Sequence, residues 1–115
     1  MKINIKKQQL VSTLSALQFL TKNQTTLPAL SCFLVRVDKN NGADVVVTDG
    51  NSFLVEKVEA DIAKDGCFAF PAKKLLDITR SIDSDDISIE VNGDLKATIN
   101  GDKTTFSLFV FRGDE

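Results

Sequence analysis

The alternation of hydrophobic and polar residues predicts short β-strands along most of the chain. The clearest pattern covers residues 87–91 and 95–99, where apolar residues occupy every second position on either side of Asn92-Gly93. An Asn-Gly pair between two alternating segments is typical of a tight β-hairpin turn, because both residues tolerate positive φ angles. We expect further strands at residues 1–5, 31–37, 44–48, 52–60, 67–70 and 104–110.

Two other segments have hydrophobic residues at the spacing of an α-helix. In residues 8–20, Leu10, Leu14 and Leu17 share one face, and polar side chains gather near the opposite face. Phe19 also falls near the polar face, which is explained if the helix ends there.

The second helical segment covers residues 71–82 and begins with a proline, which suits a first helical position. Lys73, Asp77 and Arg80 share its polar face, at spacings of four and three that let Asp77 pair with either base. The apolar face consists of Leu75, Ile78, Thr79 and Ile82.

The order of elements is therefore strand, helix, three strands, and then the same again, in halves of about 1–62 and 65–110. This order predicts an α+β fold with a duplicated β-α-β-β-β unit and two helices packed on one face of an antiparallel sheet. A chain of 115 residues, 43% of them hydrophobic, suits one compact domain covering residues 1–115.

The composition argues against catalytic and metal chemistry. Histidine is absent, so the commonest general base and metal ligand is missing. Cys32 and Cys67 have no CxxC partner. They form either one disulfide or two separate buried thiols, and we favour the two thiols, as in a cytosolic protein. The acidic residues at 83, 85 and 86 lack the spacing of a calcium-binding loop. They indicate a polar turn after the second helix instead. We expect no cofactor, no metal and no enzyme activity.

Charge is distributed unevenly along the chain. Residues 1–37 contain five bases and no acid, whereas residues 38–115 contain 9 bases and all 16 acids. This is either chance scatter on a solvated surface or a basic face that meets a polyanion and an acidic face that repels it. The isolated bases would contact a nucleic-acid backbone without reading its sequence. No apolar run approaches the roughly 18 residues that span a bilayer, so we expect no membrane partner.

Four motifs at matching spacing resemble the first domain of bacterial β sliding clamps, the DNA polymerase III processivity factor. Residues 26–31, TLPALS, look like the family's TLPIL signature, and Thr48-Asp49 resembles its TD. Residues 71–82, PAKKLLDITRSI, are very similar to the family's PAKKLFDIVRSL helix. Residues 86–91 and 103–108 match the strands that follow, so the likeness covers nearly the whole chain.

The resemblance implies a DNA-clamp fold and a processivity function in the cytoplasm. In this family three such domains make one chain, and two chains close head to tail into a ring around double-stranded DNA. Both helices would line the central hole. The replicative DNA polymerase and the clamp loader would bind through domains that this sequence does not resemble.

The resemblance also suggests residues for two surfaces. Lys73 and Arg80 match lumen positions, and Lys22 and Gln24 precede the TLP motif, where the family commonly has a DNA-contacting arginine. Gln24 keeps hydrogen bonding but lacks the charge. The expected subunit interface consists of Lys74, Lys103, Phe106 and Leu108. The alternative for Phe106 and Leu108 is that they are core residues, and both interpretations hold if one side of the strand is buried while its backbone edge is open.

Two departures leave an alternative open. Gly50-Asn51 replaces the family's usual Leu-Glu, and residues 109–115 lack the proline-containing crossing to a second domain. The chain is then either a shortened clamp or a short clamp-like gene product. The alternative function is a stand-alone clamp-like domain that binds a protein partner by its open edges without encircling DNA. An enzyme with an unrecognised site is the third and weakest reading.

Overall fold

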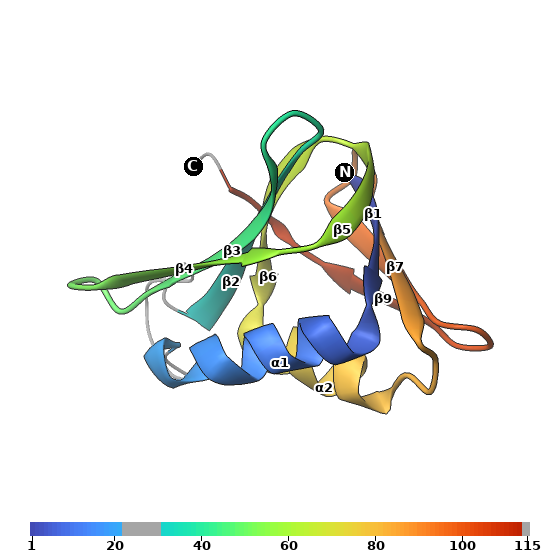
Figure 1. Cartoon of the computed structure of the whole chain (residues 1–115), viewed down its shortest axis with the longest axis horizontal. Coiled ribbons are helices and arrows are strands. Elements are labelled where there is room, and N and C mark those ends of the chain that lie inside the picture. The colour runs from blue at the N-terminus through green and yellow to red at the C-terminus, as the bar shows by residue number, and fades with distance from the viewer. Residues whose placement is uncertain (22–30, 114–115) are drawn as a thin grey trace.

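The computed structural model describes residues 1–21 and 31–113, and these form two five-stranded antiparallel sheets and two helices (Figure 1). One sheet has the strand order β5-β1-β7-β8-β9 and the other the order β10-β6-β2-β3-β4. The helices are α1 (Lys7–Leu17) and α2 (Ala72–Ser81), and the 3-10 helix η1 (Gln18–Leu20) extends α1. The strands are β1 (Lys2–Lys6), β2 (Cys32–Asp38), β3 (Gly42–Thr48), β4 (Phe53–Val58), β5 (Ala60–Lys64), β6 (Gly66–Pro71), β7 (Asp86–Val91), β8 (Lys96–Asn100), β9 (Thr105–Phe109) and β10 (Phe111–Arg112).

The predicted duplication is confirmed, and the two halves exchange strands. β1 and β5 of the first half extend the sheet that contains β7, β8 and β9 of the second half. β6 and β10 of the second half extend the sheet that contains β2, β3 and β4 of the first half. Each half thus adds one strand to the predicted unit, and the antiparallel strands divide between two sheets. Glu59, between β4 and β5, marks the point at which the chain leaves one sheet for the other.

One hydrophobic core lies between the sheets and the helices. Because alternate strand residues point to opposite faces, Ile87, Ile89 and Val91 of β7 are all buried, as the sequence pattern predicted. Leu14 of α1 and Leu75 of α2 are fully buried in the same core. The two helices lie side by side on the same side of both sheets (Figure 1), so their polar faces form one surface of the molecule.

The hairpin at Asn92-Gly93 forms, but its turn differs from the predicted one. Leu95, and not Gly93, has the positive φ, of 60°. The side-chain carbonyl of Asn92 accepts hydrogen bonds from the backbone N–H of Asp94, at 3.0 Å, and of Lys96, at 3.2 Å. The side chain of Asn92 therefore adds two hydrogen bonds to the backbone bonds that close the turn, from Leu95 N–H to the Asn92 carbonyl and from Asn92 N–H to the Lys96 carbonyl.

Asp83 and Asp85 lie in the polar turn after α2, as expected, and Asp86 begins β7. Asp86 makes an ion pair with Lys6, at 2.9 Å, and this hydrogen bond raises the pKa of the lysine. The carbonyl of Asp85 accepts a hydrogen bond from the backbone N–H of Lys7, at 2.9 Å, at the start of α1. Within residues 1–21 and 31–113, no three potential ligands gather closely enough to hold a metal ion.

The cysteines do not form a disulfide, because they lie at different levels of two paired strands. Cys32 is opposite Pro71, and Cys67 is opposite Arg36. Cys32 is buried and Cys67 is half-buried. Burial raises the pKa of the Cys32 thiol, since it disfavours the thiolate.

Neither α1 nor α2 has the length and hydrophobicity that a membrane-spanning helix would need.

Candidate nucleic-acid interface

The surface formed by α1 and α2 is more basic than the rest of the molecule. The two helices contain four of the 14 bases but only one of the 16 acids of the sequence. The bases are Lys7, Lys73, Lys74 and Arg80, and the acid is Asp77. This concentration of positive charge on one face, in a protein of net charge −2, is the electrostatic pattern of a surface that meets a polyanion.

Lys73 and Arg80 are both exposed on α2 and lie two helical turns apart, since seven residues correspond to about 10 Å of helix. Arg80 reaches towards α1, where its Nη2 donates a hydrogen bond to Ser15 Oγ at 3.1 Å. Lys7 Nζ lies 3.5 Å from the carbonyl oxygen of Arg80. These contacts join the two helices and place a third cation, Lys7, beside the predicted pair.

The ion pairing that the helical spacing allows for Asp77 is not formed. Among the described residues, the ion pairs join Lys2 to Glu90, Lys6 to Asp86 and Arg36 to Asp44. Arg80 is directed to Ser15 of α1 instead, because the helices pack close enough for this hydrogen bond. The positive charges of Lys73 and Arg80 are therefore not neutralised by a direct pair with Asp77.

A groove between η1 and α2 adjoins these cations. Its lining includes Phe19 of η1 and Lys73, Leu76 and Arg80 of α2. The Phe19 side chain is 72% exposed. The helix α1 ends at Leu17, as the position of Phe19 indicated. The position of Phe19 beside Lys73 and Arg80 was not predicted. The available signal was a large hydrophobic residue on a polar helix face.

Lys22 and Gln24, the other two predicted DNA contacts, lie outside the described residues.

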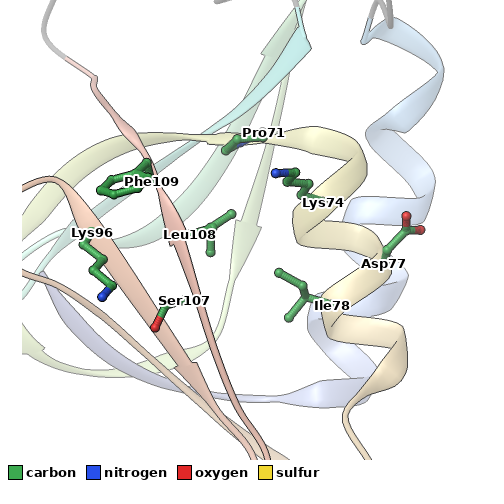
Figure 2. A pocket seen from close by; sticks show the side chains of 8 residues that line it. All are labelled: Pro71, Lys74, Asp77, Ile78, Lys96, Ser107, Leu108 and Phe109. Atoms are coloured by element: carbon green, nitrogen blue, oxygen red, sulfur yellow. The ribbon is translucent and has the colours of Figure 1, made fainter.

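A second groove lies between α2 and β9, which is an edge strand of its sheet. Lys74 and Ile78 of α2 face Leu108 of β9 across it (Figure 2). Of the predicted interface residues, Leu108 is only 8% exposed and belongs to the core, Phe106 is half-buried, and Lys103 is exposed in the turn between β8 and β9.

Sequence reasoning missed Phe109 at this groove. Its side chain is 73% exposed, next to the core residue Leu108. Phe109 lies opposite Lys96 of β8, and both line the groove (Figure 2). The alternation in β9 contained the signal, because Thr105, Ser107 and Phe109 fall on the face opposite to Phe106 and Leu108. A phenylalanine on an otherwise polar face of an edge strand is a candidate contact residue.

The comparisons with known proteins agree on one family. Residues 1–115 match the sequence model described as DNA polymerase III beta subunit, N-terminal domain. Among solved structures, the chain is similar to the sliding clamp of Pseudomonas aeruginosa, at 28% identity and a TM-score of 0.90, covering 99% of this chain and 31% of that one. It is also similar to the DNA polymerase sliding clamp of Caulobacter crescentus, at 25% identity and a TM-score of 0.92, covering 100% of this chain and 31% of that one.

The same fold occurs in the DNA polymerase beta subunit of Streptococcus pyogenes, with a TM-score of 0.92 at only 14% identity, covering 100% of this chain and 31% of that one. The chain thus spans about a third of the length of the solved proteins that it matches. No curated protein matches it.

Proposed function

The chain belongs to the family of DNA polymerase III beta subunits, as its N-terminal domain, and we propose that it forms part of a ring that encircles duplex DNA and tethers the replicative polymerase. The observation that carries this proposal is the basic surface of α1 and α2, where Lys7, Lys73 and Arg80 lie together. Cations on a helical face contact phosphates at any sequence, which suits a protein that must move along DNA.

The proposed role is structural and not catalytic. A ring holds its partner by enclosing the DNA, so this domain needs only weak backbone contacts. Water can bridge long lysine and arginine side chains to the phosphates without a fixed register. In this proposal the cytoplasmic polymerase and clamp loader bind other domains of the ring.

Ring closure in this proposal uses the β9 edge and α2. Phe109, Leu108 and Lys74 would meet the neighbouring domain, where an added strand satisfies the open backbone groups of β9. The same edge supports the second candidate function, a stand-alone domain that docks a protein partner without encircling DNA. The specific observation in its favour is the exposed Phe109.

Charge reversal on α2 tests the role of the basic surface. We expect Lys73→Glu with Arg80→Glu to lower the affinity of the chain for duplex DNA at low salt by at least about tenfold. The slope of log affinity against log salt should fall by about 2, since each lost phosphate contact removes about one unit. Fluorescence anisotropy with two duplexes of unrelated sequence measures both quantities.

The matched control reverses two exposed bases away from the helices, Lys39→Glu and Lys57→Glu, which change the net charge equally. Circular dichroism checks that both double variants are folded. Equal losses in the two double variants would show that net charge, and not the helix surface, governs binding. A marked preference for one duplex sequence would contradict the proposed backbone contacts.

A further inference from the structure

Phe19 is exposed where neither the core nor a strand edge explains it. The described chain has five exposed large hydrophobic residues, and four of them lie on the strands β4, β9 and β10. Phe19 is the one of the five that lies on a helical element, the 3-10 helix η1. The backbone N–H and the hydroxyl of Thr21 both donate to the carbonyl of Gln18, at 3.0 Å and 2.7 Å, and these bonds close η1 around Phe19. The exposed ring therefore sits in a locally hydrogen-bonded turn.

The groove beside Phe19 combines three kinds of chemistry. Lys73 and Arg80 supply positive charge, Gln18 supplies an amide that both donates and accepts hydrogen bonds, and Phe19 supplies an aromatic face. Asp77 is the one acid in the lining, so the two bases outnumber it. An aromatic ring in a positively charged groove is the arrangement with which proteins hold unpaired nucleotides, whose bases stack on the ring while their phosphates meet the cations.

We propose that this groove binds single-stranded nucleic acid, with an unpaired base stacked on Phe19 and the adjoining backbone held by Lys73 and Arg80. The inference rests on the proposed DNA-binding function of the helix surface and adds a preference to it. Bases inside a duplex are stacked on each other and leave no free face for Phe19, whereas the phosphates of both forms are open to the cations. Phe19 should therefore contribute to binding of single strands but not of duplexes.

The absence of tryptophan and tyrosine from the sequence allows a direct test. Phe19→Trp introduces the only indole of the chain, and a base stacked on it quenches its fluorescence. We expect single-stranded oligo-dT at low ionic strength to quench the emission, and an equal concentration of duplex nucleotides to quench it much less. Phe53→Trp is the matched control, because Phe53 is 70% exposed on β4 and does not line the groove.

Three results would overturn the inference. Equal quenching of Phe19→Trp by duplex and single strand would remove the preference for unpaired bases. Equal quenching of Phe53→Trp and Phe19→Trp would show non-specific contact. Quenching by poly-glutamate but not by oligo-dT would indicate an acidic protein ligand instead.

Affinities separate this inference from the proposed function. Phe19→Ala should weaken single-strand binding about tenfold, within the range of one lost stacking contact, and leave duplex affinity almost unchanged. Lys73→Glu with Arg80→Glu should weaken both. If Phe19→Ala binds single strands as the parent does, while the charge reversals still weaken duplex binding, the inference fails and the proposed function stands. If Phe19→Ala weakens single-strand binding but the charge reversals leave duplex binding unchanged, the proposed function fails.

Discussion

At the scale of single residues, the neighbours Leu108 and Phe109 of β9 have opposite environments. Leu108 is 8% exposed and packs with the core, whereas Phe109 is 73% exposed at the groove beside α2. Leu108→Ala should lower the free energy of unfolding by about 2–3 kcal/mol, because it removes buried methyl groups and leaves a cavity. Phe109→Ala should change it by no more than about 0.5 kcal/mol. Urea unfolding followed by circular dichroism measures both values.

The same pair of variants separates stability from docking. If β9 is a docking edge, Phe109→Ala should weaken association with the neighbouring domain while the domain itself stays folded. A loss of stability in Phe109→Ala as large as that in Leu108→Ala would mean that Phe109 belongs to the core. In that case β9 would have no exposed hydrophobic side chain available for docking.

At the scale of elements, the turns that the Asn-Gly pairs mark are not equivalent. A methyl group added at Gly101, between β8 and β9, would collide with the Cγ2 atom of Ile82, which is fully buried at the end of α2. A methyl group added at Gly93, between β7 and β8, would meet nothing within 4 Å. Gly101→Ala should therefore destabilise the domain by about 1–3 kcal/mol through overpacking.

Gly93→Ala is the matched control for this prediction and should change the free energy of unfolding by less than about 0.5 kcal/mol. Both glycines follow an asparagine in the same hairpin meander, so the variants differ mainly in what the new methyl group contacts. Equal unfolding midpoints for the two variants in urea would show that the turn after β8 does not pack against the end of α2.

Local patterns predicted the elements of this fold better than their pairing. Alternation identified β7 and β8, and helical spacing identified α2, because both signals arise from neighbouring residues. The transfer of β5 from β4 to β1 was not predictable, since it depends on which distant strand has an open edge. For the same reason the sequence marked Phe19 as exceptional but could not bring it beside Lys73, 54 positions later in the chain.

At the scale of the whole molecule, the duplicated fold places one polar surface on the helices and leaves β4, β5, β9 and β10 as sheet edges. The edges β4 and β9 occupy equivalent positions in the two halves, next to α1 and α2 respectively. A domain with two equivalent edges can join a neighbour at each end, and repeated head-to-tail joining closes a ring if the rotation permits it. The helix surface would then face the same side in every copy of the repeat.

We propose that this domain works as part of a ring that holds DNA by enclosing it. The most direct measurement uses a sliding clamp in which this chain replaces the N-terminal domain, loaded on nicked circular duplex DNA after sedimentation has shown the mass of the closed ring. We predict that the chimera stays on the circle and is lost when a restriction enzyme linearises it. A closed ring that leaves circular and linear DNA equally fast would contradict the claim, as would a chimera whose mass shows that the ring never forms.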